Sequence, residues 1–250
     1  MKGMKKGKAA GPSGLTSELQ QAAGKVGTKG LRNFFNNLLE GEEIPKNWKD
    51  SITIPIYKGK GDAMECGNYR GVRLLEHGMK VYEYVLERRL REIVDIGSYQ
   101  FGFRQGRSTI GAIFIVRQLQ EKYNQKKTKL YHIFIDLEKA FDRVPRKVIE
   151  WALRRKMVPE RMVEAIMALY VETKTKVKTV AGVSKDFEIR VGVHQGSILS
   201  PLLFIVVMDE VTKNFRNGVP WELGYADDLV LTAESEHDML ERFCRWIKEL

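Results

Sequence analysis

The chain has 250 residues, 43% hydrophobic and 30% charged, so it can bury a substantial core in one large or two small domains. Its net charge of +10 favours a polyanionic partner such as nucleic acid. No apolar run approaches the roughly 18 residues of a membrane span, and the basic start lacks the apolar stretch of a secretory signal. With only Cys66 and Cys244, a disulfide framework is also excluded. We therefore expect an intracellular protein, nuclear or cytoplasmic, with no membrane partner.

The first half of the chain is expected to contain three helices and one strand. Apolar residues at helical spacing predict helices over 17–40 and 76–95, and Ser108 is expected to cap a third helix that runs to about Tyr123. Residues 51–57 alternate as a short strand, and the glycine-rich KGKGD that follows predicts a turn.

The second half mixes short strands with helices. In chain order we predict a strand over 130–135, helices over 145–156 and 159–172, a hairpin of 175–181 with 186–191, a helix from Ser200, two strands within 221–233 and a terminal helix capped by Ser235. The helix from Ser200 is nearly all apolar, so it should be buried. Because strands and helices do not alternate strictly, the expected class is α+β.

Two acidic patterns carry the chemistry. In YADDLVLTA, Asp227 and Asp228 lie between apolar runs, which predicts a tight hairpin with both carboxylates at its turn. Adjacent like charges cost energy unless a cation is near, although an ordinary Asp-rich turn is the alternative. In FIDLEKAFD, Asp136 ends an apolar strand, and its alternative is a cap or strand terminator. Asp142 is expected to cap or orient the helix that Pro145 opens.

If these strands are neighbours, three carboxylates meet at one edge of a sheet. Hard oxygen ligands without His or Cys suit Mg²⁺, with Mn²⁺ as an alternative ion. Two such ions about 4 Å apart assist in-line phosphoryl transfer. A polymerase and a nuclease fit this chemistry equally well.

The ordered motifs FIDLEKAFD, HQGSILSPLLF and YADDLVL resemble the palm motifs of reverse transcriptases. Upstream, PIYKGKGD, NYRGVRLL and QFGFRQGRST resemble the fingers of retrotransposons without long terminal repeats, the LINE type. The resemblance runs from about Gly11 to the end. It implies a right-hand polymerase fold with helices around an antiparallel palm sheet: a basic tail over 1–10, then fingers over about 11–125 and palm over about 126–250, partly interleaved. The thumb is missing and is expected beyond Leu250.

The resemblance also implies roles for particular residues. Asp136, Asp227 and Asp228 are expected to be the catalytic ligands of two Mg²⁺ ions. The other implied roles are triphosphate binding by Lys58 or Lys60 and by Arg70, exclusion of the 2′-hydroxyl by Phe141, lining of the nucleotide pocket by Gln195 and Gly196, and template contact by Arg104 and Arg107. The alternatives are plain core for Phe141, surface charges for Arg70 and Arg107, a polar strand end for Gln195 and a turn glycine for Gly196.

The implied function is that of an RNA-directed DNA polymerase, which uses an RNA template, a DNA primer and deoxynucleotides. The alternatives are an inactive nucleic-acid-binding remnant of a truncated retroelement, and a nuclease. Some residues depart from the family pattern. Ser13 replaces the Asp of G-P-D-G, Gln105 replaces the Pro of FRPGRST, and Arg73 replaces a small hydroxyl residue. Gly224 is expected to weaken the strand that leads into Tyr225.

Overall fold

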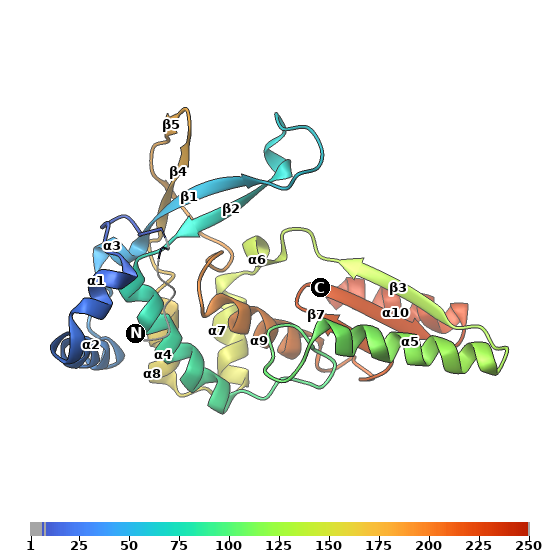
Figure 1. Ribbon diagram of the computed structural model, residues 1–250. Coiled ribbons are helices and arrows are strands. Elements are labelled where there is room, and N and C mark those ends of the chain that lie inside the picture. Colours follow the sequence, from blue (N-terminus) through green and yellow to red (C-terminus); the bar gives the residue numbers. More distant parts are fainter. Residues whose placement is uncertain (1–6, 8, 250) are drawn as a thin grey trace.

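The computed structural model describes residue 7 and residues 9–249 of the chain. The basic tail predicted over 1–10 therefore lies outside the described residues, except for 7, 9 and 10. Two separate sheets are joined by a layer of helices, as Figure 1 shows. This mixture confirms the α+β class.

The first sheet has the strand order β2-β1-β4-β5, and β6 also pairs with β4. Strand β1 (Asp50–Tyr57) is antiparallel to β2 (Tyr69–Leu74) and parallel to β4 (Lys174–Thr179). The short strands β5 (Gly182–Val183) and β6 (Phe187–Glu188) both pair antiparallel with β4, which confirms the predicted hairpin. The parallel contact of β1 with β4 joins distant parts of the chain into one sheet.

The second sheet is antiparallel, in the order β3-β8-β7. It consists of β3 (Tyr131–Asp136), β7 (Glu222–Tyr225) and β8 (Asp228–Ala233). Helix α10 (Glu236–Glu249) covers one face, where Ile133 and Leu231 pack against a core that contains Trp246. Successive side chains of a strand point to opposite faces. Phe134 therefore points away from α10, and its side chain is 71% exposed.

The main core lies in the helical layer between the sheets. It contains α2 (Gly24–Leu39), α4 (His77–Ile93), α7 (Arg146–Arg155), α8 (Glu160–Ala168) and α9 (Ser200–Thr212). Nearly every side chain of α9 is buried, as its apolar sequence predicted. The buried carboxylates Asp209 and Glu210 share Lys156, whose Nζ lies 2.5 and 3.1 Å from them, and Arg216 also pairs with Asp209 at 2.9 Å. Such pairing is what makes burial of these charges tolerable.

The predicted elements differ from the observed ones mainly in the N-terminal region. The helix expected over 17–40 is two helices, α1 (Ser17–Ala22) and α2, because Gly24 has a φ of 57° at the junction. Short helices α3 (Lys46–Lys49) and α6 (Ala140–Arg143) were not predicted. Helix α5 (Thr109–Gln125) begins as predicted, since Gly111 N donates to Ser108 Oγ at 3.2 Å.

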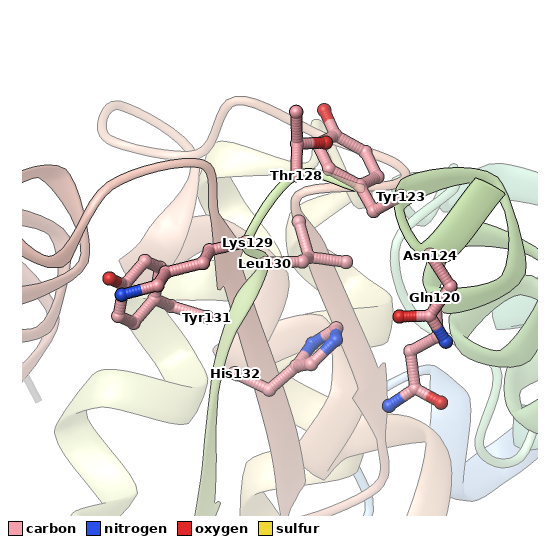
Figure 2. Close-up of a pocket in the computed structure, with 8 residues that line it drawn as sticks. All are labelled: Gln120, Tyr123, Asn124, Thr128, Lys129, Leu130, Tyr131 and His132. Carbon is pink, nitrogen blue, oxygen red and sulfur yellow. The ribbon is translucent and has the colours of Figure 1, made fainter. Parts of the chain in front are cut away.

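A hollow of about 480 Å³ lies between the end of α5 and the beginning of β3 (Figure 2). Leu130 and His132 point toward α5, while Lys129 and Tyr131 point to the other side of the strand. His132 Nδ1 lies 3.0 Å from Thr232 Oγ1. The hollow is at the end of β3 opposite to Asp136. Among the helices of the described residues, none is long and apolar enough to cross a membrane.

Candidate active site

The sheet register places two of the three predicted carboxylates side by side. Asp136 ends β3 and is the direct Cα partner of Asp228, the first residue of β8. Both residues are exposed, and strand alternation directs them to the face opposite α10. Asp136 ends one apolar strand and Asp228 begins its antiparallel neighbour, so both aspartates lie at one open edge of the sheet.

Asp227 lies in the turn that connects β7 to β8. Tyr225 pairs with Asp228, which leaves Ala226 and Asp227 as the two residues of the loop. Ala226 has a φ of 59°, the left-handed conformation required by tight hairpins of this length. The pKa of the Asp228 carboxyl is raised by partial burial and by the negative charges of Asp227 and Asp136. The three carboxylates thus act on one another electrostatically.

This donor set fits a divalent metal ion. All three groups offer hard oxygen ligands, and a bound cation would remove the repulsion that raises the pKa of Asp228. Within the described part of the chain, however, no three His, Cys, Asp or Glu side chains are already arranged to hold an ion. Binding of an ion therefore requires the three carboxylates to rearrange around it, which the exposure of Asp136 and Asp228 permits.

The tight loop before α9, which contains Gln195 and Gly196, contacts Asp142 of helix α6. Gln195 Nε2 donates to Asp142 Oδ2 at 2.6 Å, and Gln195 O accepts from Arg73 N at 3.2 Å. Gly196 has a φ of 95°, and a Cβ there would lie 3.0 Å from Arg73 O. Asp142 was predicted to cap or to orient the next helix. It does not cap α7, which follows Pro145 without a side-chain cap, because its carboxylate binds Gln195 instead. That Asp142 orients the helix stays a prediction.

The same loop is hydrogen-bonded to a buried carboxylate, that of Glu83 on helix α4. Ser197 Oγ donates to Glu83 Oε1 at 2.7 Å, and Ile198 N donates to Glu83 Oε2 at 3.2 Å. Burial raises the pKa of Glu83 to about 7, against the effect of these two hydrogen bonds. The ring of His194 packs against that of Tyr170 at a tilt of 30°, with the centroids 4.5 Å apart. Burial lowers the pKa of His194 to about 3, so its ring is neutral near neutral pH.

Phe141 lies in α6, between the carboxylates and the main core. Its ring stacks on Phe204 of α9, with centroids 4.6 Å apart and an interplanar angle of 16°. Phe103 meets the same ring edge-on at 6.0 Å. Phe141 is only partly buried, so it both packs against the core and presents part of its ring to the solvent.

The predicted triphosphate-binding residues lie on the β1–β2 hairpin of the first sheet. Arg70 is exposed on β2, opposite Ile56, and Lys60 is exposed in the connecting loop. Lys58 Nζ donates to Gly67 O at 3.0 Å, so its ammonium group closes the loop. Figure 1 shows the tip of this hairpin projecting away from the helical core. The structure therefore places these residues on a different sheet from the aspartates.

The two arginines predicted to contact template have different environments. Arg107 is exposed, and its guanidinium lies 4.9 Å from the centroid of the Phe101 ring. Arg104 is partly buried and donates to Gly97 O at 2.8 Å. Arg104 thus stabilises its own loop, and its contact with template stays a prediction.

Two buried polar residues near the site were not predicted. Glu83 and Gln100 are each 1% exposed, yet they bind backbone groups of the loops that carry Ser197 and Ala226. Glu83 lies on the apolar face of a predicted helix, where a charged residue is a recognisable exception. Gln100 lies between Tyr99 and Phe101, and only this flanking by aromatic residues signalled burial.

Residues 56–250 match the model of the family described as reverse transcriptase (RNA-dependent DNA polymerase). The chain therefore belongs to the reverse transcriptase family, which confirms the resemblance drawn from its motifs. Members of this family generally use divalent metal ions and bind nucleic acid templates.

Curated relatives come from insect retrotransposable elements. The chain is 28% identical over 239 residues to a Pol polyprotein of the type-1 retrotransposable element R2 of Nasonia vitripennis, covering 92% of the chain and 23% of the relative. It is also 28% identical over 231 residues to a probable RNA-directed DNA polymerase from transposon X-element of Drosophila melanogaster, covering 86% of the chain and 25% of the relative. The chain thus spans about a quarter of the length of these relatives, and its similarity to them agrees with the resemblance of its motifs to LINE-type reverse transcriptases.

Solved structures share the fold. An apo telomerase from Candida tropicalis matches 86% of this chain and 50% of its own, with a TM-score of 0.57 and 13% identity. A telomerase from the same organism, in complex with a fragment of telomeric RNA, matches 88% of this chain and 41% of its own, with a TM-score of 0.58 and 15% identity. At this identity the likeness concerns the fold, and it agrees with a fingers-and-palm arrangement.

Proposed function

We propose that this chain is the polymerase domain of a reverse transcriptase that copies an RNA template into DNA. The observation that carries the proposal is the register of Asp136 with Asp228, beside the turn that holds Asp227. Together with membership of the family, this arrangement favours nucleotidyl transfer over the nuclease alternative, for which no motif is present in the sequence.

In the proposed reaction the 3′-hydroxyl of a primer attacks the α-phosphate of a deoxynucleotide, and pyrophosphate leaves. Asp136, Asp227 and Asp228 would hold two divalent ions, which we expect to be Mg²⁺. When bound, such ions lower the pKa of the attacking hydroxyl and stabilise the leaving oxygen. The three carboxylates concentrate negative charge at the sheet edge, where they would hold the divalent ions that bind the phosphates of the nucleotide.

Other side chains would position the substrate. Arg70 and Lys60 are exposed cations on the fingers hairpin and would pair with the triphosphate, Arg70 as a planar fork. Gly196 would line the nucleotide pocket, and glycine suits this turn because its φ is 95° and a Cβ would lie 3.0 Å from Arg73 O. Phe141 would place its partly exposed ring under the sugar, and Arg107 would contact the template backbone.

Extension of a labelled DNA primer on an RNA template tests the proposal. The wild-type chain should extend the primer when Mg²⁺ and deoxynucleotides are supplied. Asp136→Asn should abolish extension and leave template binding largely intact, because it removes a metal ligand outside the fingers. Asp186→Asn is the matched control, since Asp186 is exposed and its pair with Lys176 at 3.7 Å is weak.

Binding of primer and template without any extension by the wild type would contradict the proposal. It would identify the chain as a non-catalytic nucleic-acid-binding remnant. Shortening of the primer would instead identify a nuclease.

A further inference from the structure

Gln100 is a buried amide that reaches the turn carrying the catalytic aspartates. Its Oε1 accepts from Ala226 N at 2.9 Å, and its Nε2 donates to Ala226 O at 3.2 Å. The same Oε1 accepts from Gly102 N at 2.8 Å. One side chain therefore binds both backbone polar groups of Ala226.

Ala226 is the residue of the turn that most needs such support. Its φ of 59° lies in the left-handed region, which residues with a Cβ disfavour. It is also 6% exposed, so water does not readily replace partners for its N–H and C=O. Because Asp227 and Asp228 follow directly, a change in the conformation of Ala226 would shift the backbone from which both carboxylates project.

The segment around Gln100 is shaped to approach this turn closely. Gly224 N donates to Tyr99 O at 2.8 Å, and Phe101 N donates to Gly224 O at 2.7 Å, so the segment runs beside β7. A Cβ at Gly102 would lie 2.2 Å from Ala226 N, and one at Gly224 would lie 3.1 Å from Gln100 Nε2. The approach therefore requires glycine at position 102, where a Cβ would clash with backbone, and glycine at position 224 relieves a tight contact with the Gln100 side chain.

The other end of the segment is fixed to helix α9. Gly97 N donates to Asp209 Oδ1 at 2.9 Å, and Arg216 pairs with the same carboxylate at 2.9 Å. The guanidinium of Arg216 also lies 4.1 Å from the centroid of the Tyr99 ring. Gln100 therefore projects from a backbone that is held in place. A side chain can position a neighbouring residue only if its own backbone is fixed in this way.

We propose that Gln100 is a positioning residue for nucleotidyl transfer, which holds Ala226 in its left-handed conformation and so aligns Asp227 and Asp228. The inference rests on the proposed function, since it concerns the metal-binding aspartates. A neutral amide is required because the turn presents one donor and one acceptor to the same side chain. An ionised carboxylate offers only acceptors, and an apolar side chain offers neither.

Primer extension by Gln100→Met tests this role, because methionine keeps the size and loses all three hydrogen bonds. Loss of a residue that orients metal ligands typically costs about 10- to 100-fold in activity, and we expect kcat to fall by this amount. The KM for deoxynucleotide and the Kd for primer–template, read by fluorescence anisotropy, should change less than about twofold, because neither site touches Gln100. Gln105→Met is the matched control, an exposed glutamine of the same loop whose substitution should leave kcat unchanged.

Gln100→Glu gives a second test, which can be carried out even if Gln100→Met does not fold. A buried carboxyl has a raised pKa, and its protonated form again offers one donor and one acceptor. The kcat of Gln100→Glu relative to wild type should therefore recover several-fold as the pH is lowered from about 8.5 to about 6.5. All rates are measured well below the Tm of each variant.

An unchanged kcat in Gln100→Met, or a pH-independent rate ratio in Gln100→Glu, would overturn the inference while wild-type extension upheld the proposed function. Parallel losses of kcat, template binding and Tm would also overturn it, because they would show a merely structural role. If the wild type itself failed to extend the primer, the proposed function and the inference would both fall.

Discussion

A sequence pattern cannot tell whether Phe141 is a core residue or faces the nucleotide site. Its ring stacks on Phe204 and is only partly buried, so the residue belongs to the core on one side and faces the solvent on the other. If the exposed side lies beneath the sugar of the incoming nucleotide, the rigid ring fills the volume of a ribose 2′-oxygen. Such exclusion is steric and can be large.

Phe141→Ala should therefore admit ribonucleotides and lower stability together. We expect the preference for deoxynucleotides to fall at least tenfold, and the free energy of unfolding to fall by about 2 kcal/mol, below the range of about 3–5 kcal/mol for a fully buried phenylalanine. Ratios of kcat/KM for the two nucleotides and urea unfolding check both effects. Phe114→Ala, at a residue 59% exposed on α5, is the control. Lost stability with an intact preference would defeat the sugar gate.

Sequence reasoning placed the aspartates well because their positions follow from strand alternation. Asp136 ends one apolar run, Asp228 begins another, and a tight hairpin holds Asp227 next to Asp228. The roles of residues that contact distant parts of the chain were predicted less well. Gly224 was expected only to weaken its strand, but the absent side chain lets Gln100 and Tyr99 approach to within 3.1 Å of its Cβ position.

Ser13 is another departure from the family pattern that the fold explains. Its N–H and its hydroxyl each donate to the carboxylate of Glu76, at 2.6 Å. An aspartate at this position would place two carboxylates in contact, which is unfavourable. The serine therefore suits a chain that carries glutamate at position 76, and this contact spans a sequence separation that no local pattern reveals.

At the scale of elements, Glu83 links α4 to the loop that begins α9. Burial raises its pKa from 4.5 to about 7, so the folded state holds a proton that the unfolded chain releases between these values. The stability contributed by this proton is present below pH 4.5 and is lost as the pH rises to about 7. Lys80 on the same helix reduces the shift without reversing it.

Glu83→Gln should remove this dependence, because glutamine does not titrate. Between about pH 5 and pH 8, the free energy of unfolding of wild type relative to the variant should fall by about 3 kcal/mol. Urea unfolding of both proteins at the two pH values measures the difference. Ser235→Ala is a suitable reference, because it removes only a helix-capping bond, to Asp238 N at 3.1 Å. A wild-type-to-variant difference that stays constant with pH would contradict the assignment.

Element prediction succeeded where apolar periodicity is strong and local. The buried helix α9, the β7–β8 hairpin and the Ser108 cap of α5 all follow from the sequence pattern. The parallel pairing of β1 with β4 does not, because alternation identifies a strand without naming its neighbour. The break at Gly24 was missed since glycine can either continue or interrupt a helical pattern.

At the scale of the whole molecule, the net charge of +10 should dominate binding to nucleic acid. Phosphate contacts release counterions, so affinity falls as salt rises. We expect the Kd for an RNA–DNA primer–template to increase at least about tenfold between roughly 50 and 200 mM salt. Fluorescence anisotropy measures it directly. An affinity that barely changed over this range would indicate an extensive apolar or stacking interface instead.

We propose that the sheet edge with Asp136, Asp227 and Asp228 performs templated nucleotidyl transfer. Incorporation of a single deoxynucleotide opposite each of the four RNA bases measures this activity, with wild type and Asp227→Asn compared in parallel. We expect the wild type to add only the complementary nucleotide, and Asp227→Asn to bind the same primer–template but to add none. No addition by the wild type, addition that ignores the template base, or equal addition by Asp227→Asn would contradict it.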